Sequence, residues 1–242
     1  MAPPSRVRRS LLAALLAAAA ALFVVLGIWQ VERRVWKLDL IAAVDRRIHA
    51  APRPAPGPLA WPAFSAEAEV YTRVQVFGTF LSNRAELVQA VTELGPGFWL
   101  LVPLRTDEGW TVLVNRGFVP PERAAAELRS SGAPASGVTV TGLLRAPESG
   151  GAFLRNNDPA ADHWFSRDVP AIAAARGLGP VAPYFIDADA TPNPGGYPVG
   201  GLTVVAFRNT HLVYALTWFG LAALCLGGLW ILATGRAEEG RA

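Results

Sequence analysis

Two long apolar segments, one near each end of the chain, most constrain what this sequence can fold into. Residues 11–29 and 212–233 contain no charged side chain. A helix of roughly 20 apolar residues is long enough to cross the ~30 Å hydrocarbon layer of a bilayer. The composition agrees, because 52% of the 242 residues are hydrophobic and only 17% are charged, which is too apolar for an ordinary soluble domain. The sequence therefore predicts a membrane protein with two transmembrane helices.

The first apolar segment also has the features of a secretory signal peptide. Arg6, Arg8 and Arg9 precede it, and its alanine tract offers small residues for cleavage. The apolar core of a signal peptide is usually ~7–15 residues long, whereas this segment continues to Trp29 without a break. We therefore expect a retained anchor. Because no amphipathic, serine-rich organellar presequence precedes it, we expect a bacterial inner-membrane protein.

Charge counting alone does not orient the chain, because Arg33, Arg34 and Lys37 follow the first span as closely as the N-terminal arginines precede it. Long loops translocate largely regardless of their charge, and the first helix usually sets the topology. We therefore expect both termini in the cytoplasm and the region between the spans in the periplasm. The expected organisation is a cytoplasmic N-terminus (1–10), a first transmembrane helix (11–29), a periplasmic helix and proline-rich linker (30–64), a periplasmic β-rich domain (65–210), a second transmembrane helix (211–233) and a cytoplasmic tail (234–242).

The helix of the first span is expected to continue beyond the membrane. Val31, Val35, Leu38 and Ala42 recur at i, i+4, i+7 and i+11, which is helical spacing. Prolines then recur between residues 52 and 62, where their fixed φ and missing N–H groups favour an extended polyproline segment. The pattern predicts a spacer between the anchor and the domain.

The region after the prolines shows strand patterns. Polar and apolar residues alternate over 70–80, and two apolar runs, 98–104 and 110–119, flank Arg105-Thr106-Asp107-Glu108-Gly109, which suits a hairpin turn. Shorter strands are expected at 138–144, 184–187 and 203–207, and one short helix at 168–176, with Asp168 as its N-cap. The predicted fold class is a membrane protein whose two transmembrane helices flank an α+β, mostly antiparallel β, periplasmic domain, with a compact sheet or small open barrel.

Several kinds of chemistry have little support in the sequence. The one cysteine, Cys225, lies inside the second span, so the exported domain has no disulfide and no thiolate metal site. The formal net charge is only +3 and the arginines are scattered, so nucleic acid is not an expected partner. The glycines of 194–201 lack the Lys-Ser/Thr of a phosphate-binding loop and predict a turn-rich loop.

Two polar features remain open between a structural and a functional interpretation. Asp158, Asp162 and His163 offer acid–base or metal-binding groups, but their surroundings predict a polar turn. Arg116 is either a partner-binding charge or, more commonly for an arginine in a strand, a solvated or paired one. A membrane-anchored periplasmic enzyme that uses residues 158–163 therefore stays a minor alternative. A sensor is a weaker alternative, because few residues follow the second span.

The most informative single residue is His211, immediately before the second span. An ionisable or coordinating group at a membrane edge is a functional candidate by default. A neutral imidazole can ligate haem iron, and aromatic and small residues beside it could receive a porphyrin. The other interpretation is a histidine that hydrogen-bonds at a helix start. If a helix begins at His211, the residues that share its face are Tyr214, Ala215, Trp218, Ala222 and Cys225.

Four blocks of residues follow one another along the chain: Gly27-Ile28-Trp29-Gln30 with Arg33 and Trp36-Lys37; Val114-Asn115-Arg116-Gly117 with Val119-Pro120; Pro194-Gly195-Gly196 with Pro198 and Gly200-Gly201; and Asn209-Thr210-His211-Leu212 with Tyr214-Ala215 and Thr217-Trp218-Phe219. Taken together and in this order, the blocks resemble the surfeit locus protein 1 family. Phe118 stands where the family pattern leads one to expect tryptophan, and Val213 where glutamine is frequent, so the surface beside His211 differs in detail.

The resemblance implies a non-catalytic assembly factor that helps to mature the catalytic subunit of haem-copper cytochrome c oxidase, in connection with haem a. Its expected partners are that subunit, haem a synthase and the lipid bilayer, and its expected cofactor is transiently bound haem a. The alternative is a protein scaffold for the oxidase subunit that binds no haem. In this light the candidate haem-binding residues are His211, as the metal ligand, with Tyr214, Trp218, Trp29 and Gln30.

Overall fold

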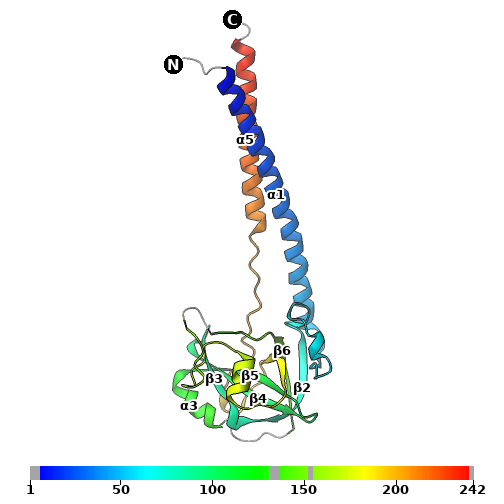
Figure 1. Cartoon of the computed structure of the whole chain (residues 1–242), viewed down its shortest axis with the longest axis vertical. Helices are drawn as coiled ribbons and strands as arrows, with labels where there is room; N and C mark the ends of the chain where they lie inside the picture. Colours follow the sequence, from blue (N-terminus) through cyan, green and yellow to red (C-terminus); the bar gives the residue numbers. More distant parts are fainter. Residues whose placement is uncertain (1–5, 131–136, 152–154, 240–242) are drawn as a thin grey trace. The chain divides into compact units, whose positions relative to one another are not determined.

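The computed structural model describes residues 6–130, 137–151 and 155–239, in two compact units (Figure 1). Residues up to 43 and from 206 onward form a helical unit, and residues 44–205 form a β domain. The outer ends of the predicted cytoplasmic segments, 1–5 and 240–242, lie outside the described residues.

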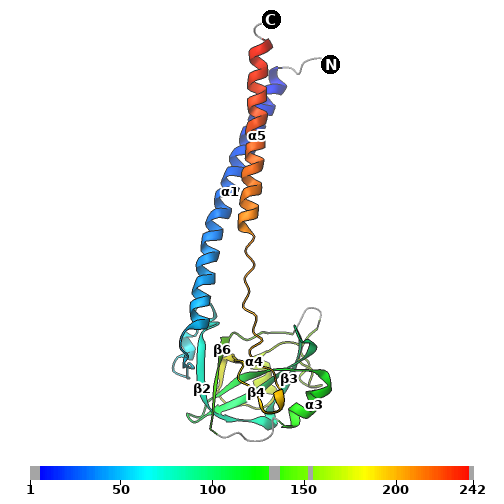
Figure 2. The same cartoon turned by 180° about the vertical axis from the view of Figure 1, so that it is seen from behind.

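The helical unit contains two helices that lie side by side in both views, α1 (Arg6–His49) and α5 (His211–Glu239) (Figures 1 and 2). Both are long and apolar enough to cross a membrane. As predicted, α1 continues well past residue 29 and ends before Pro52. Small residues mark where the helices approach each other: Ala20, Ala215 and Ala222 are buried.

Two aromatic contacts hold α1 against α5. The rings of Phe23 and Trp218 stack, with their centroids 5.6 Å apart. One turn along α1, Gly27 lies beneath the Phe219 ring, and a Cβ at this position would come within 2.6 Å of that ring. Close approach at a small residue is how helices commonly pack in lipid, where no hydrophobic effect drives their association. The glycine therefore allows the two helices to meet.

The β domain is built on a seven-stranded sheet in the order β1-β2-β6-β7-β5-β4-β3, with an additional pairing of β2 with β4. This pairing closes β2, β6, β7, β5 and β4 into a ring, while β1 and β3 lie at its margins. The strands are β1 (Arg53–Pro54), β2 (Arg73–Phe80), β3 (Glu86–Thr92), β4 (Gly95–Thr106), β5 (Thr111–Val119), β6 (Val138–Arg145) and β7 (Val181–Ala188); the helices are α2 (Ala66–Glu69), α3 (Pro121–Ser130) and α4 (Val169–Ala175), with short 3-10 turns η1 (Trp61–Ala63), η2 (Ser82–Arg84) and η3 (Pro194–Gly196).

The central strands are covered on both faces, which explains why β5 is buried along almost its whole length. Alternate residues of β5, Val112 and Val114, pack in one core cluster with Tyr184 of β7. The intervening residue, Leu113, packs in a second cluster with Ile172 of α4. Because side chains alternate between the faces of a strand, burial on both faces requires apolar residues at successive positions, as this strand has.

Most of the predicted strands are present, and the sheet is mostly antiparallel, as predicted. The hairpin across residues 105–109 is confirmed, with Gly109 at φ 88° in the turn. The predicted Asp168 cap is also confirmed, because its side chain accepts a hydrogen bond from the backbone N–H of Ala171. Two pairings, β1 with β2 and β5 with β7, are parallel. The alternation of residues within one strand does not predict which strand it pairs with or in which direction.

One strand prediction was wrong, and two elements were missed. Residues 203–207 form no strand and pair with no strand of the sheet. Strand β3 was missed because its buried face carries Glu86 and Ala90 beside Val88, which breaks the apolar alternation. Helix α3 was missed because only part of its surface packs on the domain.

The proline-rich segment is part of the β domain rather than the separate spacer that its composition predicts. Its strand β1 pairs with β2. The carbonyl oxygen of Pro56 accepts hydrogen bonds from the Tyr184 hydroxyl, at 2.6 Å, and from the Trp61 indole, at 2.9 Å. Trp61 in turn packs edge-on against Trp110, with their ring centroids 5.9 Å apart. The large aromatic side chains between and after the prolines anchor the segment to the core.

Candidate functional site

His211, the candidate identified in the sequence, is the first residue of α5. The backbone N–H groups of Val213 and Tyr214 donate to the carbonyl oxygen of Thr210, and the Asn209 side chain accepts a long hydrogen bond, 3.4 Å, from the backbone N–H of His211. A helix start leaves its first N–H groups without intrahelical partners, and the Asn209 side chain caps the first of them. The local sequence therefore fixes where the helix begins, and it places the imidazole in the first turn.

The imidazole of His211 is hydrogen-bonded to Gln30 of α1. Its Nδ1 lies 2.7 Å from Oε1 of Gln30, a short and well-formed hydrogen bond between residues 181 positions apart. Gln30 is only 9% exposed, whereas its neighbours Trp29 and Val31 are 52% and 43% exposed. The structure thus brings together two of the predicted site residues, and it does so inside the helical unit.

The other predicted residues surround this pair in different ways. Trp218 is half-buried and stacked on Phe23. Tyr214 is 54% exposed and Trp29 52% exposed, so both rings lie largely on the outside of the helix pair. The small residues of the His211 face are buried against α1 rather than open to a ligand. Any flat ligand at His211 would therefore approach from the exposed aromatic side.

The donor chemistry at His211 would allow one nitrogen ligand to a metal centre such as haem iron. Of the two ring nitrogens, Nδ1 is bonded to Gln30, and among the residues that the structure describes Nε2 has no hydrogen-bond partner. A histidine whose second ring nitrogen bonds to an oxygen acceptor is the usual arrangement at metal centres. The described part of the chain contains no cluster of three or more His, Cys, Asp or Glu residues that could hold a bare metal ion. The imidazole can therefore offer one nitrogen ligand, through Nε2.

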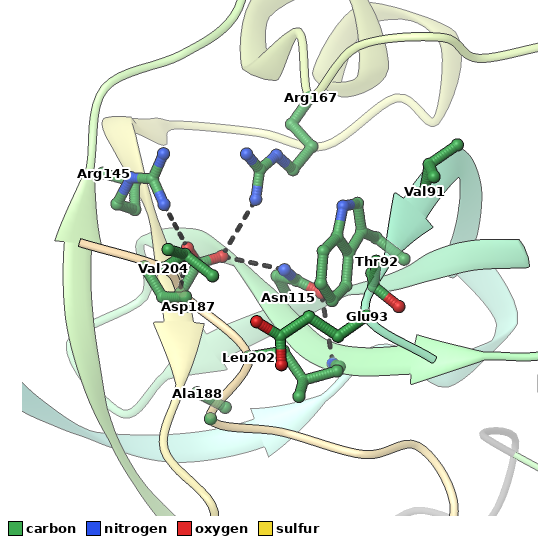
Figure 3. A pocket seen from close by; sticks show the side chains of 14 residues that line it. Val91, Thr92, Glu93, Asn115, Arg145, Arg167, Asp187, Ala188, Leu202 and Val204 are labelled. Atoms are coloured by element: carbon green, nitrogen blue, oxygen red, sulfur yellow. Dashed lines mark hydrogen bonds and ion pairs between the residues drawn. The ribbon is translucent and has the colours of Figure 1, made fainter. Parts of the chain in front are cut away.

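A second candidate is a pocket of about 420 Å³ in the β domain, where β5, β6 and β7 meet (Figure 3). At its base lies Asp187, which is 3% exposed. Figure 3 shows Arg145, Arg167 and Asn115 converging on this carboxylate, from which their nitrogen atoms lie 2.7, 3.2 and 2.8 Å away. Thr203 donates a fourth hydrogen bond, at 2.9 Å. A buried carboxylate with four donors is fully satisfied.

The charged side chains around this pocket carry more negative than positive charge. Arg167 also donates to Glu148, so two guanidinium groups face two carboxylates. Burial by itself would raise the pKa of Glu148, but the hydrogen bonds and the charge of Arg167 outweigh it and hold that pKa below its usual value. Glu93 at the pocket adds a further negative charge. This excess of negative charge does not favour an anionic ligand, and the network ties together β5, β6 and β7.

Sequence reasoning did not identify this network, although two signals were present. Asn115 belongs to the Val-Asn-Arg-Gly block of the family resemblance, and its side-chain oxygen also accepts from the backbone N–H of Gly117. Asp187 ends an apolar strand, where a single buried acid usually has a cationic partner. Neither signal points to Arg145 or Arg167, which lie on other segments.

The remaining polar candidates have structural partners. Arg116 donates to Asn193 Oδ1 at 2.7 Å and lies over the Phe80 ring, and burial lowers its pKa. Residues 158–163 form the polar turn that was predicted, closed by backbone hydrogen bonds between Asp158 and His163.

One further buried acid was not anticipated. Glu86 is 2% exposed and forms an ion pair with Arg176, which also pairs with Asp162. Burial raises the pKa of Glu86 to about 7, although Arg176 acts in the opposite direction.

Comparisons with known proteins cover both units. A sequence model of the SURF1 family matches residues 17–223, which include Gln30, His211 and the whole β domain. Proteins named Surfeit locus protein 1 from Mus musculus and Homo sapiens are both 37% identical to this chain; the alignments cover 82% of it and 68% and 69% of the relatives. The protein of that name from Takifugu rubripes is 34% identical, over 82% of this chain and 87% of the relative. The similarity thus extends from inside α1 to inside α5.

Proposed function

Given that this chain belongs to the SURF1 family, we propose that it is a non-catalytic assembly factor for haem-copper cytochrome c oxidase. In this proposal it assists maturation of the catalytic subunit by binding haem a or handing it over. The observation that carries the proposal is the hydrogen bond between Gln30 and His211, because it presents an oriented imidazole at the start of an apolar helix. The proposed partners are the oxidase subunit and haem a synthase.

Haem a would supply an iron centre that accepts one further nitrogen ligand, and His211 is the residue proposed to provide it through Nε2. Gln30 orients the ring from the other side. Trp29 and Tyr214, both about half exposed, offer aromatic surface beside the imidazole, and Trp218 braces the helix pair by stacking on Phe23. One ligand and a partly open aromatic surface suit transient binding better than permanent retention.

We propose further that α1 and α5 span the bacterial inner membrane and that residues 30–210 are periplasmic. Large apolar side chains on the outside of these helices support a lipid environment: Leu15 is 66% exposed, Leu224 74% and Trp230 69%. Exposing such an apolar surface to water costs a free energy of roughly 25 cal/mol for each Å². A lipid bilayer removes this cost.

A fusion experiment tests the orientation. A reporter enzyme that is active only in the periplasm, inserted after Gly150, should be active, whereas the same reporter at the C-terminus should be inactive. Activity at the C-terminus together with inactivity after Gly150 would reverse the proposed topology.

The haem proposal is tested by the haem-to-protein ratio of the protein purified from cells that make haem a. His211→Ala should lower this ratio about tenfold to hundredfold, as expected for losing about 1–3 kcal/mol from one ligand. The protein should still insert, because residues 212–233 are unchanged. His163→Ala, which alters an exposed histidine of the β domain, is the matched control and should leave the ratio unchanged.

Oxidase activity in the same membranes separates the remaining alternatives. If the ratio is unchanged but oxidase activity falls, a protein scaffold that binds no haem is favoured. If neither changes, His211 is only a histidine at a helix end, and the proposal loses the observation that carries it.

A further inference from the structure

We propose that Gln30 is a positioning residue that fixes the tautomer of His211, with the proton on Nδ1 and the lone pair on Nε2. The importance of this tautomer for haem rests on the function proposed above, but the tautomer is a property of this chain alone. It can be measured on haem-free protein.

The argument begins with the hydrogen-bonding capacity of the two groups. The atom of Gln30 that lies 2.7 Å from Nδ1 is the side-chain carbonyl oxygen, Oε1. A carbonyl oxygen only accepts hydrogen bonds, so Nδ1 must carry the hydrogen. A neutral imidazole has a single ring proton, and Nε2 therefore keeps its lone pair. Only a nitrogen with a free lone pair can ligate a metal.

Burial makes this bond hard to replace. Gln30 is 9% exposed, and an amide buried without a partner costs free energy that a bond to His211 offsets. The bond also depends on how closely the helices approach, and Gly27, one turn earlier on α1, permits that approach by lying under the Phe219 ring.

The same position could not be filled by an apolar residue with the same result. Free histidine in water prefers the tautomer with the proton on Nε2, which would block ligation at that atom. A side chain without an acceptor at position 30 would remove the preference for Nδ1–H. A reversed amide, with its NH₂ group facing Nδ1, would enforce the wrong tautomer, so the orientation of the Gln30 amide is the decisive feature.

The test is a nitrogen NMR measurement on the full chain. The sequence contains 3 histidines, so His49→Gln with His163→Gln leaves His211 as the only imidazole. In haem-free protein labelled with ¹⁵N-histidine, at alkaline pH where imidazole is neutral, Nδ1 should show a directly bonded proton and Nε2 should not. Observation of the proton on Nε2 would overturn the proposal.

Two variants in this background complete the test. Gln30→Leu should shift His211 to the Nε2–H tautomer, and it should also lower the haem-to-protein ratio by about tenfold, which is typical when the outer partner of a ligand is lost. Val31→Leu, which changes the exposed neighbour, should leave both unchanged. If Gln30→Leu keeps the proton on Nδ1, Gln30 does not set the tautomer.

The failure of this inference is distinguishable from the failure of the proposed function. A proton on Nε2 in the chain that keeps Gln30 and has His211 as its only histidine contradicts the role of Gln30, whatever haem does. A proton on Nδ1 combined with an unchanged haem ratio in His211→Ala supports the role of Gln30 and contradicts the haem proposal.

Discussion

Asp187 is the residue whose loss should most damage the β domain. It is 3% exposed and accepts hydrogen bonds from Arg145, Arg167, Asn115 and Thr203. Asp187→Asn keeps the shape of the side chain but removes its charge and one of its two acceptor oxygens. Arg167 retains Glu148, whereas Arg145 loses its paired carboxylate while its side chain is only 19% exposed.

Removing one partner of a buried ion pair costs about 3–5 kcal/mol, and we expect about 3 kcal/mol here because only one arginine loses its pair. For a domain of this size, each kcal/mol lowers the melting temperature by roughly 2–4 °C, which gives a decrease of roughly 6–12 °C. The assay is thermal unfolding of the full chain in detergent, followed by tryptophan fluorescence.

Asp189→Asn is the matched control. Asp189 is two positions further along, and among the described residues its side chain accepts hydrogen bonds only from Thr191, an exposed residue two positions beyond it. A substitution there should change stability by no more than about 0.5 kcal/mol. Equal melting temperatures for Asp187→Asn and the wild type would refute the view that the Asp187 network holds the strands together.

Two further predictions concern the same domain. Burial raises the pKa of Glu86 from 4.5 to about 7, so the folded state binds the carboxyl proton more tightly than the unfolded state does. The contribution of this proton to the free energy of unfolding is therefore fully present below pH 4.5 and is lost as pH rises through 7. In the wild type, this effect should lower the free energy of unfolding by up to about 3 kcal/mol between those pH values, as measured by urea unfolding. Glu86→Gln should abolish this decrease, and the same pH dependence in the variant and the wild type would contradict the prediction. Gly117 has φ 133°, and a Cβ there would lie 2.1 Å from the carbonyl oxygen of Val199. Gly117→Ala should therefore lower the melting temperature markedly, whereas Gly179→Ala, which has open space, should not.

Periodicity was a good guide to the elements whose burial is regular. The alternation of Val74 and Val76 with polar neighbours predicted β2, and the apolar run of β5 predicted a strand. The guide failed where a side chain is buried through an ion pair instead of apolar contact. Glu86 is as buried as Val74 and Val76, but a glutamate in the sequence indicates an exposed position, and β3 was therefore missed.

The proline-rich segment shows a different limit. Composition alone favoured an extended spacer, and the backbone there is indeed partly extended. Composition could not predict that the hydroxyl of Tyr184, far along the chain, donates a hydrogen bond to the carbonyl oxygen of Pro56. Proline has no N–H to donate, but its carbonyl oxygen remains an acceptor that a core residue can use.

The sequence by itself determined the two apolar helices, most of the strands and the position of His211 at a helix start, because each depends on residues near one another in the chain. The tertiary structure alone decided that β2 pairs with β4 to close the ring, that Asp187 collects donors from separate segments, and that Gln30 meets His211 across 181 residues. Local patterns indicate which apolar side chains are buried. They do not encode which partner it meets, because that depends on how distant segments pack together.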